Sequence, residues 1–199
     1  PNNATPRAAN PANLNEDCKI YDETANAKPV YAKTQLIIKN TNGQYPDFNN
    51  KDNFIQYIEG QPERCKSGSK FDFNNYNSRT ICGGSNQNIG FIMNIHFCLP
   101  VEDDITFHIG ADFGKGGVAF FNNDLTTAVT KGDYWAPQWN HGAAWIVSKS
   151  LPRGQHKFRI VAGEGCCDGD GQIYYQTGSK PNARAVNFAN LSADCKEYD

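Results

Sequence analysis

Two adjacent cysteines, Cys166 and Cys167, stand in a stretch that is rich in glycine and carboxylate residues. Residues 163–171 include four glycines, and glycine adopts positive φ at no steric cost, so we expect a tight loop here. Neighbouring side chains of an extended chain point to opposite sides. We therefore expect the two cysteines to bond to different partners and to make the loop a stapled junction. A redox centre is disfavoured because the Cys-x-x-Cys spacing is absent.

The same stretch brings together three carboxylates, from Glu164, Asp168 and Asp170. Asp112 lies in a second glycine-rich stretch, residues 110–117, whose backbone could approach a sugar or a cation closely. Carboxylate oxygens are ligands that calcium takes in proteins. Two interpretations stay open: a disulfide-anchored turn, or a rim loop that binds calcium or a polar ligand. In the second, Asp112, Asp168 and Asp170 are the candidate calcium ligands, although no cofactor is required.

Aromatic and amide side chains gather in residues 134–141. The candidate sugar-binding residues in this stretch are Tyr134, Trp135, Trp139 and Asn140. Aromatic rings pack against the C–H faces of sugars, and amide groups bond to sugar hydroxyls, so the stretch suits a glycan. The alternative is that both indoles cover the edge of the core.

The chain has seven cysteines, which are many for a cytosolic protein of 199 residues. They are Cys18, Cys65, Cys82, Cys98, Cys166, Cys167 and Cys195. Zinc-type spacing is missing, so disulfides formed in an oxidising compartment are the better account. Because the number is odd, one thiol is either free and packed as a small hydrophobe or bonded to another chain. Which cysteines pair stays open, although Cys65 and Cys82 bracket an irregular segment that they could staple.

Other features favour an extracellular, secreted protein. Asn3 and Asn190 each begin an N-glycosylation sequence, and Pro1 is typical of a processed N-terminus. No apolar run reaches the ~18 residues that a membrane helix needs. The net charge is −2 and no cluster of lysine or arginine stands out, which argues against nucleic acid as a partner.

Short strands separated by Gly, Pro and Asn turns dominate the chain after residue 30. The clearest has a period of two, with one face formed by Phe91, Met93, Ile95, Phe97 and Leu99. Further strands are expected at residues 34–39, 105–109, 117–121, 125–129, 145–149, 156–161 and 172–176. Residues 54–58 fit one helical turn or a strand. This pattern predicts an all-β fold, an antiparallel β-sandwich of jelly-roll-like form.

Residues 1–30 differ from the rest because they are small, polar and broken by proline. Such a segment cannot bury enough apolar area to fold alone. We expect an N-terminal arm ahead of a disulfide-stapled sandwich formed by residues 31–199. The arm is either a disordered tail or an extended segment that docks on a sheet edge of a neighbouring subunit, with Cys18 tying it down.

Residues 89–178 resemble a known family of proteins. The resemblance rests on the amino-acid sequence of residues 107–121, on Tyr134 followed by Trp135, and on the run Cys166-Cys-Asp-Gly169. The family is that of secreted double-cysteine surface domains, distantly like the protective-antigen-type β-sandwich of adhesins and toxins. It implies an extracellular sandwich used in surface structure, adhesion or glycan binding. In calcium-dependent adhesins of that wider superfamily two consecutive aspartates ligate the ion, whereas the matching positions here are Ala111 and Asp112.

These features together predict a structural subunit of an extracellular filament, surface layer or matrix. Assembly would run through the N-terminal arm, because head-to-tail edge pairing that does not close builds a polymer. The alternative is a glycan-binding, lectin-like adhesin module, in which calcium could assist. No nucleophile elbow, phosphate loop or metalloprotease motif occurs, so we do not expect an enzyme.

Overall fold

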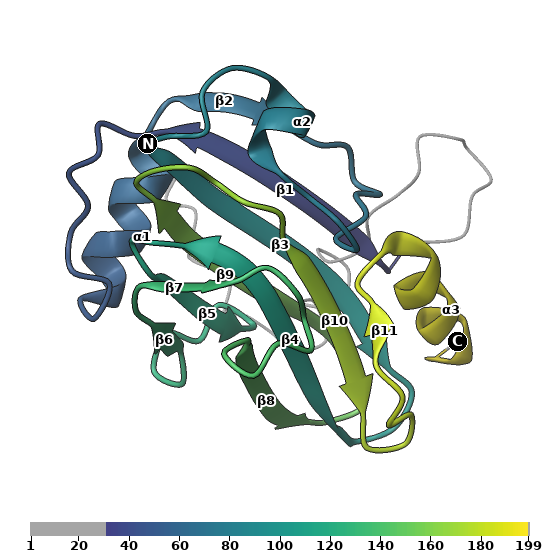
Figure 1. The fold of residues 1–199 in the computed structure, drawn as a ribbon. Helices are drawn as coiled ribbons and strands as arrows, with labels where there is room; N and C mark the ends of the chain where they lie inside the picture. The colour runs from purple at the N-terminus through teal and green to yellow at the C-terminus, as the bar shows by residue number, and fades with distance from the viewer. Residues whose placement is uncertain (1–30, 199) are drawn as a thin grey trace, which may run out of the picture. The chain divides into compact units, whose positions relative to one another are not determined.

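The computed structural model describes residues 31–198, which form two antiparallel β-sheets packed face to face (Figure 1). The first sheet has the strand order β2-β1-β3-β9-β5-β6. The second has the order β11-β10-β4-β7, and β8 also pairs with β4. The predicted antiparallel β-sandwich is therefore confirmed. The expected arm of residues 1–30, with Cys18 and Asn3, lies outside the described residues.

The strands have the following bounds. In the first sheet they are β1 (Lys33–Asn40), β2 (Glu63–Lys66), β3 (Ile89–Leu99), β5 (Gly117–Phe121), β6 (Val129–Lys131) and β9 (Gly154–Glu164). In the second sheet they are β4 (Asp103–Phe113), β7 (Tyr134–Ala136), β8 (Trp145–Leu151), β10 (Gln172–Thr177) and β11 (Arg184–Ala185). The helices are α1 (Lys51–Gly60), α2 (Ser78–Cys82) and α3 (Phe188–Tyr198).

The core between the sheets is built from aromatic side chains. Alternate residues of a strand face the same side of a sheet, and the predicted inward face of β3 is buried throughout. Phe107 of β4 stacks on Phe158 of β9 with ring centroids 4.1 Å apart, so the two sheets meet through these rings. Phe91 and Phe113 make a second contact between the sheets, nearer the other end of the strands, at 5.5 Å.

Helix α1 covers the outer face of the first sheet. Phe54 and Ile58 are fully buried and belong to one apolar cluster with Ile92 and Val161, which point outward from β3 and β9. This packing decides the ambiguity at residues 54–58 in favour of a helix. It also explains why β3 is buried on both faces.

One expected strand is wrong. The residues of 125–129 lie mostly in a turn, and the strand is β6, which begins only at Val129. Asp124 accepts hydrogen bonds from the backbone N–H of Thr126 at 3.0 Å and from the hydroxyl of Thr127 at 2.7 Å. Such local side-chain bonds compete with a sheet ladder and fix the turn.

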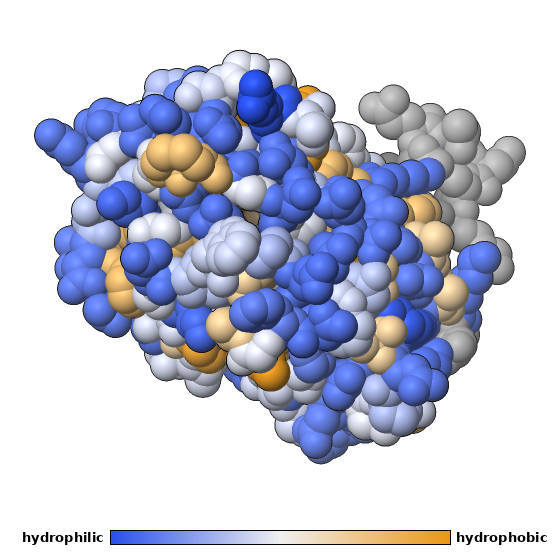
Figure 2. All heavy atoms as spheres, in the orientation of Figure 1, coloured by the Kyte–Doolittle hydropathy of each residue, from blue (hydrophilic) through white to orange (hydrophobic). Residues whose placement is uncertain are grey.

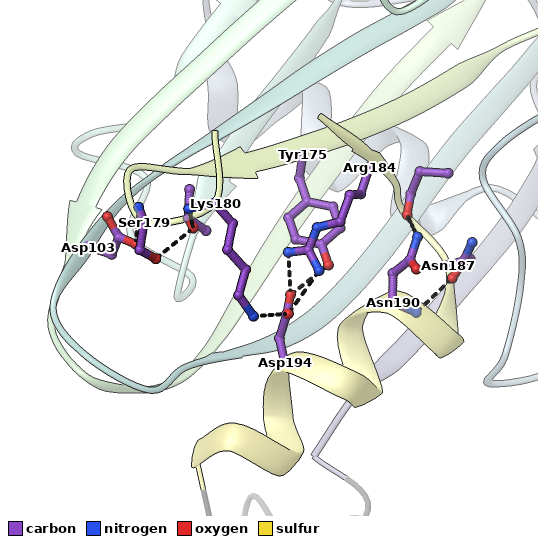
Figure 3. Close-up of polar contacts among 10 residues, drawn as sticks. Asp103, Tyr175, Ser179, Lys180, Arg184, Asn187, Asn190 and Asp194 are labelled. Atoms are coloured by element: carbon purple, nitrogen blue, oxygen red, sulfur yellow. Dashed lines mark hydrogen bonds and ion pairs between the residues drawn. The ribbon is translucent and has the colours of Figure 1, made fainter. Parts of the chain in front are cut away.

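The sequence does not predict helix α3, which tertiary contacts hold in place (Figure 3). Asp194 is only 6% exposed, and its carboxylate accepts bidentate bonds from Arg184 at 2.9 and 2.7 Å. Lys180 donates to it at 3.0 Å and the Tyr175 hydroxyl at 2.7 Å. Burial alone would raise the pKa of Asp194, but these hydrogen bonds lower it overall. The Cys98–Cys195 disulfide fastens the same helix to β3.

The side chain of Asn190 is engaged in the first turn of α3. Its Nδ2 donates to the carbonyl of Ala185 at 2.9 Å, and its backbone N–H donates to the side chain of Asn187 at 2.9 Å (Figure 3). A glycan at Asn190 would replace one of the two hydrogens on Nδ2 and leave the other for the bond to Ala185.

Candidate functional site

The candidate site lies at one end of the sandwich, where β9 ends at Glu164 and β10 begins at Gln172. Residues 165–171, called the cysteine loop below, connect these strands and run across the upper left of Figure 1. Strand β7 pairs with the end of β4 beside this loop, with Trp135 opposite Asp112. Residues from both sheets therefore meet at this end.

Cys166 and Cys167 are bonded to each other, with Cα atoms 3.7 Å apart. The expectation that each bonds to a different partner is wrong. It assumed an extended chain, whereas Cys167 has a φ of 74°. The remaining described cysteines form Cys65–Cys82, which confirms the proposed staple, and Cys98–Cys195. Cys166 and Cys167 are both exposed, so their disulfide presents an apolar face to solvent.

Backbone and side-chain hydrogen bonds hold the cysteine loop rigidly. The carbonyl of Asn86 accepts the N–H groups of Cys167 and Asp168, both at 3.0 Å. The buried Asp168 carboxylate accepts the N–H of Ser78 at 2.7 Å, at the start of α2. Asn77 donates to the carboxylate of Asp170 at 3.3 Å. The loop is therefore positioned by segments far away in the sequence.

The glycines of this loop are needed for close approach. None of them has positive φ; Cys167 is the loop residue that does. A Cβ on Gly171 would lie 2.6 Å from the hydroxyl of Tyr76, and one on Gly163, just before the loop, would lie 2.6 Å from the ring of Tyr45. A Cβ on Gly169 would lie 3.4 Å from Asp112 and 3.5 Å from Nε1 of Trp135. The loop therefore packs directly against the side chains of the site.

Asp112 and Glu164 form a pair of carboxyl groups. Glu164 is 3% exposed, and its carboxylate accepts the N–H groups of Gly114 at 2.5 Å and Cys166 at 2.7 Å. Asp112 is hydrogen-bonded to Glu164 and accepts the N–H of Gly169. Burial, followed by the charge of Glu164, raises the pKa of Asp112 to about 7. Asp112 therefore keeps its proton up to near neutral pH and can donate it to the Glu164 carboxylate.

Trp135 is the exposed aromatic residue of the site. Its side chain is 65% exposed, and its indole lies near Gly169 and Asp112. Tyr134, a predicted ligand residue, is instead buried and donates to the carbonyl of Ile109 at 3.2 Å. Its ring is not available to a ligand, because residues alternate between the two faces of β7.

Trp139 lies further along the outer face of the second sheet. Its ring stacks on Tyr174 at 4.6 Å and meets His108 edge to face at 5.8 Å. Gly110 lies beneath it, since a Cβ there would fall 2.6 Å from the backbone nitrogen of Trp139. Asn140 is exposed beside it. The two predicted sugar-binding indoles therefore differ: one is free of stacking partners among the described residues, and the other already covers the sheet.

We call the group Asp112, Trp135, Cys166, Cys167 and Gly169 the Trp135 surface. It lies on the side of the molecule that carries β4 and β10, and Figure 2 shows that side to be mostly hydrophilic with small, separate hydrophobic groups. An aromatic ring and an apolar disulfide beside carboxyl oxygens can pack on an apolar face and bond to hydroxyl groups.

The donor set does not suit the expected calcium ion. Within residues 31–198, no group of three or more His, Cys, Asp or Glu is placed to hold a metal ion. Asp112 is bonded to Glu164 and Gly169, and Asp168 to Ser78. Each of these carboxyl groups therefore already makes bonds within the protein, which leaves too few oxygens for a calcium ion but still allows a single hydrogen bond to a ligand hydroxyl.

Solved structures share the fold. The A domain of epithelial adhesin 9 from Candida glabrata, in complex with Galβ1-3GlcNAc, matches with a TM-score of 0.52 and 10% identity over 82% of this chain and 90% of that chain. A subtype-switched form of that domain, in complex with β-lactose, matches at 0.50 and 11% identity, over 81% and 88%. The PA14 domain of the MpAFP antifreeze protein matches at 0.51 and 10% identity, over 85% and 94%.

These likenesses establish a β-sandwich of the kind found in PA14 and adhesin domains. No family model and no curated protein matches the sequence. No helix in the described part of the chain is long and apolar enough to cross a membrane.

Proposed function

We propose that this chain is a glycan-binding adhesin module that holds a sugar at the Trp135 surface. The observation that carries the proposal is the exposure of the Trp135 indole beside Asp112 and beside Gly169 of the cysteine loop, whose disulfide is also exposed. An indole that is 65% exposed, next to a loop with an exposed disulfide and beside carboxyl groups, forms an apolar area with a polar rim, which is typical of a binding site.

The chemistry of the surface suits a sugar ring. The indole and the disulfide offer apolar faces to C–H groups, and the Asp112 carboxyl group offers a hydrogen-bond partner to hydroxyls. The cysteine loop is held by bonds from Asn86 and Ser78, so little conformational entropy is lost on binding. The fold supports the same reading, since sandwiches of this kind include adhesin domains solved with galactosides.

The proposal is tested by glycan binding of the full chain and of Trp135→Ala. We expect the wild type to bind galactoside-bearing oligosaccharides on a glycan array, and the variant to bind them roughly tenfold more weakly or not at all. Val101→Ala is the matched control, because Val101 is 54% exposed and lies after β3, at the opposite end of the sandwich. Equal binding by all three proteins, or binding by none, would refute the proposal.

A structural role in covalent assembly is the second candidate function. The described cysteines are all paired with one another, which leaves none of them for Cys18. In an oxidising compartment the remaining thiol can therefore join two chains. Non-reducing gel electrophoresis of the wild type and of Cys18→Ser tests this: a dimer band in the wild type alone supports it, and a monomer in both contradicts it.

A further inference from the structure

We propose that the Trp135 surface binds an uncharged sugar without calcium, with the Asp112 carboxyl group contacting a ligand hydroxyl directly and Glu164 as its positioning residue. This inference rests on the proposed function. It departs from the expectation of the sequence resemblance, in which two consecutive aspartates hold a calcium ion.

The first support is Ala111, which stands where the resemblance would place the other of the two consecutive aspartates. Ala111 is 1% exposed and faces the core of β4, in regular register with Ala136 of β7. An aspartate at Ala111 would be a buried carboxylate with no partner, which is strongly unfavourable. One acid alone does not make a calcium site, since calcium takes six to eight oxygen ligands.

The second support is that groups of the protein itself already bond to the Asp112 carboxyl group. Glu164 contacts Asp112, and its own carboxylate is bonded to the N–H groups of Gly114 and Cys166. Gly169 donates its N–H to Asp112. These contacts hold the Asp112 carboxyl group in one orientation, which is the role that a bound ion would otherwise serve.

The charge of the loop indicates the class of sugar. Glu164, Asp168 and Asp170 lie in or next to the cysteine loop, and Lys115 is the cation whose side chain packs against it, at Gly165. Like charges repel, so a sialylated or sulfated sugar is disfavoured here and an uncharged one is favoured.

The test measures binding of the full chain to matched neutral, sialylated and sulfated galactosides on a glycan array, in EDTA and in millimolar calcium. We expect neutral members to bind equally in both conditions. Asp112→Ala should weaken binding roughly tenfold or more, while Asp112→Asn, which keeps a hydrogen-bonding side chain, should retain most of it. Glu164→Ala should weaken binding and Glu164→Gln should restore part of it.

Loss of neutral binding in EDTA with recovery in calcium would overturn the inference and leave the proposed function standing. Preference for sialylated or sulfated members would overturn the choice of an uncharged sugar. Binding to no member would refute the proposed function instead. The calcium claim is then still tested by thermal melting: we expect no rise in Tm with calcium, and a rise that Asp112→Asn abolishes would contradict the inference.

Discussion

The carboxyl groups of Asp112 and Glu164 are hydrogen-bonded to each other, although Asp112 belongs to β4 in one sheet and Glu164 ends β9 in the other. The pair therefore joins the two sheets at the end of the sandwich where the cysteine loop begins. The charge of Glu164 disfavours ionisation of Asp112, so the contact depends on the proton that Asp112 keeps.

This pair predicts a specific pH dependence of stability. The pKa of Asp112 in the folded protein is about 7, above its ordinary value of 3.8, so the folded protein keeps a proton that the unfolded chain releases between these values. The resulting stabilisation is present at low pH and is lost as pH rises through the folded pKa. Asp112→Asn keeps a hydrogen-bonding side chain and does not titrate. The Tm of the wild type relative to this variant should therefore fall as pH rises across that range.

Comparing the Tm of the wild type with that of Asp112→Asn cancels the effect of titrating groups that both proteins contain. Burial lowers the pKa of His96 to about 4, so its contribution to stability rises with pH, in the opposite direction. Both proteins share this histidine. A difference in Tm that stays constant or grows with pH would show that Asp112 does not keep this proton.

The disulfides predict a second result. Cys98–Cys195 closes a loop with a sequence separation of 97 and holds α3 on β3, so the double variant Cys98→Ala, Cys195→Ala should lose about 2–5 kcal/mol of unfolding free energy. Urea denaturation measures this loss. Double replacement of the exposed Cys166 and Cys167 is the comparison, and it should cost less because that bond joins neighbours in the sequence. The reverse order of effects would contradict the account.

A third prediction concerns Gly110 of β4. The chain segment that contains Trp139 packs directly on this glycine. A Cβ on Gly110 would fall 2.6 Å from the backbone nitrogen of Trp139, so Gly110→Ala must push this segment off the sheet and lower Tm. Gly142→Ala is the matched control in the same loop, because a Cβ there would meet nothing within 4 Å. Equal Tm values for the two variants would show that the segment is not packed as described.

The sequence predicts the sandwich because apolar residues at every second position of a strand mark the side chains that are buried. Phe91, Met93, Ile95 and Phe97 are all fully or almost fully buried, as their spacing requires. It does not predict α3, whose position depends on Arg184 and Lys180 meeting Asp194 in the folded protein. Local patterns of burial carry no information on such side-chain contacts between elements.

The site is predicted in part for the same reason. Trp135, Asp112 and the adjacent cysteines stand out by residue type, and the fold brings them together. The sequence marks Glu164 only as one of three acids, because its role comes from its contact with Asp112 across the fold. The sequence does not reveal the bond between the two cysteines, because residue type does not show that the chain turns with positive φ at Cys167.

The central claim is that a sugar binds at the Trp135 surface, and NMR titration tests it most directly. The three indole N–H signals, from Trp135, Trp139 and Trp145, report on different places: an exposed indole, one stacked on Tyr174, and one that is 3% exposed. On addition of lactose or Galβ1-3GlcNAc, we expect the largest shifts at the Trp135 indole and at the backbone amides of Gly169 and the two adjacent cysteines. Shifts centred on Trp139, or no shifts at a saturating sugar concentration, would contradict the account.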